Sequence, residues 1–201
     1  MIIKLGKRLI IINRNGYGLK IERVFTHKSK RAFVVECLQR SGLDVVVETG
    51  THMGDMIQAV LPYCKRIYSI ELDDKLFSKA VEKFKAEEKV KLFHGDSGKE
   101  LSKILETLNK PVLFWLDGHF SGEGTARGDF DTPIKQELAT ILGGSVSDNL
   151  ILIDDARLFN GKNDYPDIKD LRSLIANSDK KYKLTVKNDI IVIKSDKERL
   201  I

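Results

Sequence analysis

The stretch that decides the fold is Asp44-Val45-Val46-Val47-Glu48-Thr49-Gly50-Thr51-His52-Met53-Gly54. Three consecutive valines favour a buried strand, because β-branched side chains suit extended backbone. The strand ends in an acid, and the glycines that follow are typical of a tight turn. Apolar residues then recur at helical spacing, at Ile57, Val60, Leu61 and Cys64. The stretch therefore predicts a strand, a glycine turn and an amphipathic helix in succession.

One predicted helix precedes this unit, and strands and helices alternate after it. Before it, Phe33, Val34, Cys37 and Leu38 predict a helix that ends at Ser41-Gly42. After it, each strand is followed by one amphipathic helix, and Thr132-Pro133 is predicted to open one of them, with Thr as cap. Such spacing requires crossover helices and a parallel sheet. The five predicted parallel strands are Asp44–Glu48, Arg66–Glu71, Val90–His94, Pro111–Asp117 and Asn149–Asp154.

The end of the chain departs from this alternation. Tyr182–Val186 and Ile190–Ile193 read as strands, and only Lys187–Asp189 separates them. Three residues are too few for a crossover helix, so these strands must form an antiparallel hairpin. We therefore predict an α/β fold of Rossmann-like type. It is a three-layer sandwich whose mostly parallel sheet ends in an antiparallel C-terminal hairpin.

Residues 1–31 are predicted to be a basic N-terminal extension, and residues 32–201 a single domain. The extension holds nine Lys or Arg and one Glu, a formal charge of +8, which leaves 25 basic and 28 acidic residues, or −3, for the remainder. Leu9–Asn13 and Leu19–Phe25 read as two strands joined by a turn, and so predict a hairpin. The charge is either a contact surface for anionic partners or an ordinary solvated face.

The composition is that of a soluble globular protein, with 42% hydrophobic and 31% charged residues. The two cysteines, Cys37 and Cys64, lie on predicted core faces of helices and show no paired motif. This usage, without a signal peptide, favours a reduced state and a cytoplasmic location. The extension has no apolar run of the roughly 18 residues that would predict a membrane span. Nothing in the sequence indicates an oligomeric state.

The turn after the first strand has the pattern Glu48-x-Gly50-Thr51-x-x-Gly54, which differs from the G-x-G-x-x-G of dinucleotide-binding proteins. A second acid, Glu71, ends the next strand 23 positions later, near the spacing at which an acid binds ribose hydroxyls. Together with the final hairpin, these features resemble the class I S-adenosylmethionine-dependent methyltransferases. The resemblance covers residues 44–194, about three quarters of the chain.

The resemblance implies a role for each residue at the carboxyl edge of the sheet. Glu48 would lie near the methionine part of S-adenosylmethionine, and Glu71 would bind the ribose. An acid at Asp96, beside Ser97, would reach the adenine amino group; alternatively, either residue caps the following helix. The other residues predicted to bind the cofactor are Gly50, Thr51, His52 and Gly54.

Three more carboxylates, Asp117, Asp154 and Asp155, follow the fourth and fifth predicted strands. Carboxylates at one sheet edge repel one another unless a cation neutralises them, and oxygen ligands suit Mg²⁺, Mn²⁺ or Ca²⁺. The arrangement resembles metal-dependent O-methyltransferases, with Asp155 nearer to those that modify sugars. The sequence thus predicts a divalent metal at these three residues. The alternative is that they form helix caps and salt bridges with residues such as Arg157.

The resemblance implies methyl transfer to a hydroxyl of a small polar acceptor, for instance a sugar, assisted by a divalent cation. Asp117 and His119 are the candidate catalytic residues, with His119 as base because imidazole titrates near neutrality. The glycine-containing connection Gly118–Thr132 reads as a lid. Two alternatives stay open. One is a nucleic-acid methyltransferase or binding module that uses the basic arm, and the other is a non-catalytic scaffold.

Overall fold

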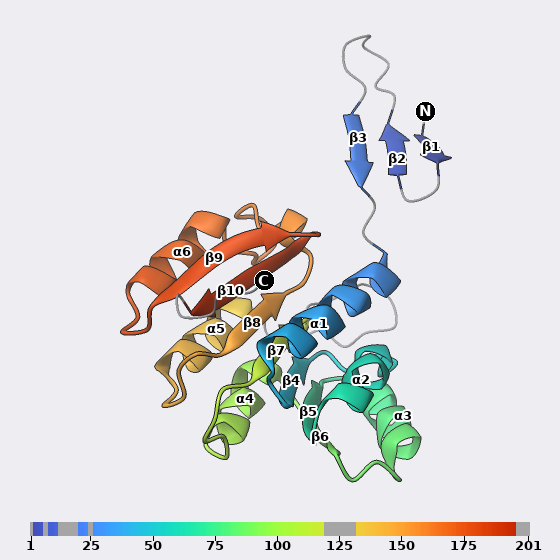
Figure 1. Ribbon diagram of the computed structural model, residues 1–201, viewed down its shortest axis with the longest axis vertical. Coiled ribbons are helices and arrows are strands. Elements are labelled where there is room, and N and C mark those ends of the chain that lie inside the picture. Colours follow the sequence, from blue (N-terminus) through green and yellow to red (C-terminus); the bar gives the residue numbers. More distant parts are fainter. Residues whose placement is uncertain (1, 6–7, 12–19, 24–25, 119–131, 196–201) are drawn as a thin grey trace.

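The computed structural model describes residues 2–5, 8–11, 20–23, 26–118 and 132–195 of the chain. Seven strands form one sheet in the order β6-β5-β4-β7-β8-β10-β9 (Figure 1). The first five in this order pair in parallel, and β10 pairs antiparallel with both β8 and β9. The predicted fold class is confirmed. The strands are β4 Val45–Thr49, β5 Arg66–Glu71, β6 Val90–His94, β7 Leu113–Leu116, β8 Leu150–Ile153, β9 Tyr182–Lys187 and β10 Ile190–Ser195.

Helices cover both faces of this sheet, and together they enclose two apolar cores. Neighbouring residues of one strand point to opposite faces, so Val46 packs with α1 to α3 while Val45 and Val47 pack with α4 to α6. Both faces are buried, which explains the unbroken valine run. The helices are α1 His27–Ser41, α2 Asp55–Val60, α3 Asp74–Phe84, α4 Ser97–Leu105, α5 Ile134–Gly143 and α6 Ile168–Ala176.

Three local details differ from the sequence-based expectation. The helix after the glycine turn ends at Val60 and continues only as a short 3-10 turn, Leu61–Tyr63, because Pro62 has no N–H to donate to a carbonyl one turn earlier. Helix α5 starts one residue later than predicted, with Pro133 at the cap position. The Thr132 hydroxyl accepts a hydrogen bond from the Ile134 amide at 3.4 Å, which is a weak interaction.

The N-terminal hairpin is also present, as part of a separate three-stranded antiparallel sheet. Strands β2 (Arg8–Ile11) and β3 (Lys20–Arg23) form the predicted pair, and β1 (Ile2–Leu5) adds a strand that the sequence analysis did not foresee. The turn predicted at residues 14–18 lies outside the described residues. Helix α1 begins at His27, so Lys30 and Arg31, counted in the basic extension, belong to a helix that packs on the sheet.

Both cysteines are free and buried, and the expected reduced state stays a prediction. Over the described part of the chain, the helices are too short and too polar to cross a lipid bilayer. The predicted division of the chain at residue 31 stays a prediction.

The glycine turn after β4 is sterically required at Gly50. This residue has a φ of +84°, and a Cβ there would stand 2.5 Å from the Asp117 carbonyl oxygen. We expect Gly50→Ala to lower the free energy of unfolding by about 2–4 kcal/mol, because it adds backbone strain and a clash with main chain that cannot move aside. Urea unfolding of the purified protein measures this loss.

Gly42→Ala is the matched control for this substitution. Gly42 also has a positive φ, +68°, but a Cβ added there would meet nothing within 4 Å. It should therefore lose only the roughly 1–2 kcal/mol of a left-handed alanine. Equal losses in the two variants would show that the close approach to Asp117 has no energetic weight.

Candidate active site

Hydrogen bonds continue the parallel ladders past the ends of β4, β7 and β8. The Asp117 amide donates to the Thr49 carbonyl at 3.0 Å, and the Asp154 amide donates to the Leu116 carbonyl at 3.1 Å. The Gly50 amide donates to the Ile70 carbonyl at 2.9 Å. These contacts hold the predicted cofactor turn and two of the predicted metal ligands next to one another, at the carboxyl edge where ligands bind in open parallel sheets.

A cleft of about 360 Å³ opens at this edge. Its size lies within the range of roughly 300–1,000 Å³ that is usual for small-molecule sites. The cleft brings together four predicted cofactor residues with Asp117 and Asp154, whereas Gly54, Glu71, Asp96, Ser97 and Asp155 do not line it. The lining residues are His27, Lys30, Arg31, Glu48, Gly50, Thr51, His52, Met53, Asp55, Met56, Trp115, Asp117 and Asp154.

A buried chain of polar side chains connects the glycine turn to Glu48. The Ser69 hydroxyl donates to a Glu48 carboxylate oxygen at 2.5 Å, and the Thr51 and Ser69 hydroxyl oxygens are 2.6 Å apart. When Glu48 is ionised, the Ser69 hydroxyl donates to it, and Thr51 then donates to Ser69. Burial, and to a smaller extent the charge of Glu71, raises the pKa of Glu48 to about 8, although the Ser69 hydrogen bond opposes this shift. Glu48 is thus a carboxyl group that is largely protonated at neutral pH in the free protein.

Glu71 holds the glycine turn in shape. One of its carboxylate oxygens accepts from the His52 amide at 2.7 Å, and the other accepts from the Asp73 amide at 2.9 Å. His52 has a positive φ of 49°, an uncommon conformation for a residue other than glycine, and this hydrogen bond helps to fix it there. Each carboxylate oxygen keeps a second lone pair, so these contacts leave Glu71 able to accept hydroxyl groups.

Asp96 takes the capping role that was the alternative to adenine binding. It is the N-cap residue of α4, and its side chain accepts from the Gly98 amide at 2.8 Å. Ser97 is buried beside Glu137 of α5. Burial raises the pKa of Glu137 to about 7, although the neighbouring Ser97 and Thr49 hydroxyl groups oppose this shift. Adenine binding by Asp96 or Ser97 stays a prediction.

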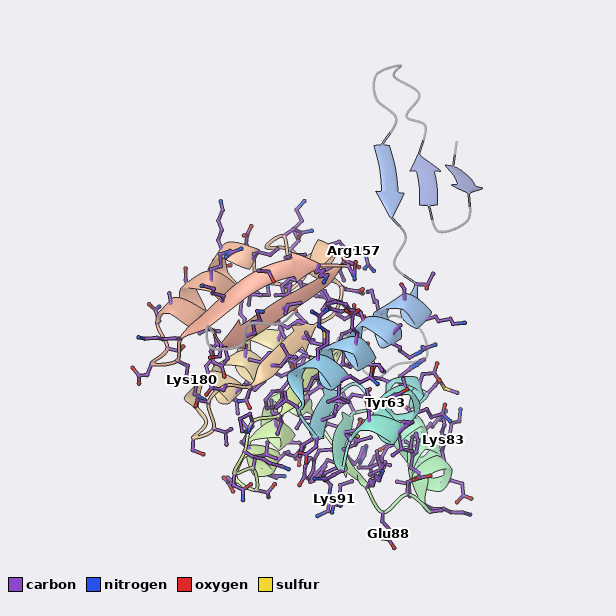
Figure 2. The ribbon with its side chains drawn as sticks, viewed as in Figure 1. Tyr63, Lys83, Glu88, Lys91, Arg157 and Lys180 are labelled. Carbon is purple, nitrogen blue, oxygen red and sulfur yellow. The ribbon has the colours of Figure 1, made fainter. Side chains whose placement is uncertain are left out.

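A lysine lies between the aspartates that were predicted to bind a metal. The Lys30 ammonium, on α1, forms ion pairs with Asp154 and Asp155 and lies 3.3 Å from a carboxylate oxygen of Asp189, in the turn between β9 and β10. Lys30 is only 4% exposed. Arg157 approaches the same acids from the surface: it donates to Asp155 at 2.6 Å and is also paired with Asp189. Figure 2 shows Arg157 beside the β9–β10 hairpin.

These contacts affect the carboxyl groups differently. Burial raises the pKa of Asp155, but the Lys30 and Arg157 contacts outweigh burial, so its pKa falls below the usual value. For Asp154, burial and the neighbouring charge of Asp155 prevail over Lys30 and raise the pKa. Burial, followed by repulsion from Asp154, Asp155 and Glu48, raises the pKa of Asp117 well above its ordinary value. Burial therefore disfavours the charged forms of Asp117 and Asp154, whereas the contacts with Lys30 and Arg157 favour the charged form of Asp155.

The predicted metal centre does not fit this geometry. Two of the three predicted ligands, Asp154 and Asp155, are bound to the Lys30 ammonium, so a cation of the protein itself lies where the divalent ion was expected. Across the described residues, no three His, Cys, Asp or Glu side chains are placed to hold a metal ion. The salt-bridge alternative, which the sequence analysis had left open with Arg157 as partner, describes the observed contacts of Asp155.

Sequence reasoning missed two charged residues that lie on otherwise apolar helix faces. Lys30 stands at helical spacing with Phe33, Val34, Cys37 and Leu38, all of which are buried. Glu137 shares the inner face of α5 with Ile134, Leu138 and Ile141. A charge on a buried face needs a partner, and this signal was available in the sequence. It was overlooked because Lys30 was counted only as part of the basic extension.

The candidate base His119 lies outside the described residues, and so does the predicted lid Gly118–Thr132 apart from its first and last residues. Their roles stay predictions. Gly118, which leads into this connection, lies close to the side chains of Thr49 and Ser97, so a Cβ there would stand 3.2 Å from each hydroxyl oxygen. Gly118 therefore lies beside the Thr49 and Ser97 hydroxyl groups at the carboxyl edge of the sheet.

The fold is shared with known methyltransferases, although no protein-family model and no curated protein sequence matches the chain. It resembles methyltransferase PaMTH1 of Podospora anserina, bound to S-adenosylhomocysteine, with a TM-score of 0.61 and 17% identity over 85% of this chain and 80% of that one. The O-methyltransferase TomG of Streptomyces achromogenes, in complex with S-adenosylmethionine, gives 0.60 and 14% over 85% and 80%. The 23S rRNA methyltransferase ErmE gives 0.55 and 13% over 89% and 72%. These similarities establish that the chain has the class I methyltransferase fold.

The raised pKa of Glu48 predicts a specific dependence of stability on pH. Because the folded-state pKa of about 8 lies above the ordinary 4.5, folding favours the protonated form, and stability is lost as the pH rises from about 4.5 through 8. Glu48→Gln removes this loss while keeping an oxygen that accepts from Ser69. We expect the variant to gain stability over the parent as the pH rises, by of the order of 4 kcal/mol at pH 9.

Unfolding free energies of the two proteins at pH 5, 7 and 9 measure this difference. Taking the difference between the proteins cancels the contribution of Glu137, which is present in both. A constant difference across the three pH values would mean that Glu48 is ionised in the folded protein throughout.

Proposed function

We propose that the protein is an S-adenosylmethionine-dependent methyltransferase that methylates a hydroxyl group of a small polar acceptor, for instance a sugar. The observation that carries this proposal is the cleft at the carboxyl edge of the sheet. Its lining joins the glycine turn and Glu48, which match the methyltransferase pattern, to Asp117 and Asp154 on the neighbouring strand ends. A cofactor and an acceptor bound there would be in contact with each other, as a transfer reaction requires.

Glu48, Gly50, Thr51 and His52 are assigned to the cofactor end of the cleft. The ammonium group of the cofactor's methionine part would pair with Glu48 in its ionised form. Since burial raises the pKa of Glu48 to about 8, cofactor binding near neutral pH would release a proton. Glu71 is assigned to the ribose hydroxyls, through the lone pairs that its two backbone contacts leave available.

The reaction is a displacement at the sulfonium methyl group. An acceptor oxygen forms a bond to the methyl carbon while the carbon–sulfur bond breaks, and the electron pair of that bond goes to sulfur. The acceptor proton passes to a base, for which Asp117 and His119 are the candidates. Asp117 lines the cleft, and His119 follows it by two residues. The chain's own part in this step is to align the two substrates and to exclude water.

A nucleic-acid acceptor is less well supported than a small polar one. Its main support was the charge of residues 1–31, of which Lys30 is buried in ion pairs and Arg31 lies in α1 beside Asp55, at 3.1 Å. Without these two residues, the extension has seven basic residues and one acidic residue, or +6. RNA binding that weakens steeply with salt, combined with methylation of that RNA, would favour this acceptor class instead.

The proposal predicts specific binding of the cofactor, measured by titration calorimetry with S-adenosylmethionine and with S-adenosylhomocysteine. We expect both to bind, and we expect Glu71→Ala to weaken binding by about 1–3 kcal/mol, because ribose hydroxyls lose a charged acceptor. Repeating the titration in buffers of different ionisation enthalpy measures the proton that Glu48 is expected to release.

Glu88→Ala serves as the control for this series. Glu88 is exposed in the loop between α3 and β6, far from the carboxyl edge (Figure 2), and its side chain should not influence cofactor affinity. Absence of binding by the folded parent protein would favour the non-catalytic scaffold. Unchanged affinity in folded Glu71→Ala would remove the ribose role from Glu71.

A further inference from the structure

The contacts of Lys30 assign this residue a part in the acceptor end of the cleft. Lys30 comes from α1, whereas the acids it binds come from the end of β8 and from the β9–β10 turn, more than a hundred residues later in the chain. Its ammonium reaches Asp154 and Asp155 together, and Lys30 and Asp154 both line the cleft. The ammonium is therefore a fixed positive charge at the wall of the site, and not a surface charge that happens to be near.

Several features of the backbone hold the acids in place for this contact. Asp155 adopts a left-handed conformation, with a φ of 54°, and its amide donates to the Asp154 side chain at 2.7 Å. The Asp189 carbonyl accepts from the Ala156 amide at 2.9 Å, and its side chain accepts from the Arg157 amide at 3.0 Å. The β8 end and the hairpin turn are thereby joined around the Lys30 ammonium. Such a preformed set of carboxylates is a cation site, and the protein fills it with its own cation.

We propose that the Lys30 ammonium takes the place of a divalent cation at this edge, so that the carboxylate cluster beside the acceptor is neutralised without bound metal. This inference rests on the proposed methyl transfer. The acceptor would then meet Asp117 and a wall made of Lys30 and Asp154, and its hydroxyls would be oriented by hydrogen bonds instead of by chelation. Lys30 is a positioning residue in this scheme, because its ion pairs hold the Asp154 and Asp155 side chains in place at the end of β8.

Competition between the lysine and a metal ion favours the lysine for a physical reason. A divalent ion entering between Asp154 and Asp155 would have to displace an ammonium that is 4% exposed, which would leave that buried charge with Asp189 in place of its two nearer partners. The ion would also give up bound water. The lysine also loses bound water, but it does so when the chain folds, because it is part of α1. Removing the ammonium should convert the same carboxylates into a site that accepts a divalent ion.

The experiment titrates Mn²⁺ into the full-length protein and measures free Mn²⁺ by electron paramagnetic resonance. We expect the parent protein to show no specific binding at free Mn²⁺ concentrations up to about 1 mM. A site with a Kd of about 1 mM would be half filled at that concentration. Lys30→Met, which keeps a long side chain without the charge, should bind Mn²⁺ at least tenfold more tightly. Adding Asp154→Asn to Lys30→Met should abolish this binding, because it replaces a charged carboxylate with a neutral amide and so removes a negative charge and one of the two carboxylate oxygens.

Two control variants separate charge from other effects. Lys30→Arg keeps a cation between the aspartates and should bind no more Mn²⁺ than the parent, while Lys28→Met removes an exposed lysine from the same helix and should also match the parent. If Lys30→Met fails to fold, Lys30→Gln replaces it, since the amide still donates a hydrogen bond to Asp154 or Asp155. Circular dichroism of each variant verifies folding before the titration.

The Mn²⁺ titrations test the inference without any measurement of enzymatic activity. Tight Mn²⁺ binding by the parent that Asp154→Asn removes would overturn it, and so would a folded Lys30→Met or Lys30→Gln that binds no better than the parent. The readout contains no cofactor, so the result stands apart from the methyl-transfer proposal. Calorimetry with S-adenosylhomocysteine on the parent tests that proposal separately, and loss of cofactor binding there would leave the Mn²⁺ result unaffected.

Discussion

The parallel pairing of β4 with β5 and β7 is the constraint on which the site depends. Because these strands run in the same direction and in register, Thr49 is paired with Ile70 on one side and with Leu116 on the other. The ladder then continues one step further, through the amides of Gly50 and Asp117. The polar residues that follow these parallel strands consequently lie at the same edge of the sheet. A hydroxyl chain, a glycine turn and several carboxyl groups meet there although they are remote in sequence.

Carboxylate groups gathered at one edge repel one another, and two effects reduce this repulsion. Burial raises the pKa of Glu48 to about 8 and that of Glu137 to about 7, which favours the neutral form of both carboxyl groups. Where the acids are packed most densely, Lys30 and Arg157 supply the opposite charge. Glu48 lies beside the glycine turn, whereas the ion-paired acids Asp154 and Asp155 lie at the end of β8. This division matches the proposed cofactor and acceptor ends of the cleft.

Much of the fold was predictable because it rests on local patterns. Three local patterns each specify an element without reference to distant residues: the valine run of β4, the helical spacing of Leu101 and Ile104, and the short link before β10. The differences arose where one residue changes the outcome: Pro62 ends a helix early, and the Thr132 hydroxyl binds the Ile134 amide only weakly. The extra strand β1 was missed because four residues of IIKL carry too short a pattern to distinguish a strand from other extended chain.

For the site, the sequence by itself determined which residues stand at the strand ends, because strand direction and the alternation of strand and helix fix that edge. Glu48, Asp117 and Asp154 were found in this way, and the structure places all three in one cleft. Only the tertiary structure decided what neutralises the acids. The choice between a metal ion and a lysine depends on where α1 packs against the sheet, and this brings Lys30 to residues more than a hundred positions away. Side-chain contacts over such separations follow from the packing of the whole core, which no local pattern encodes.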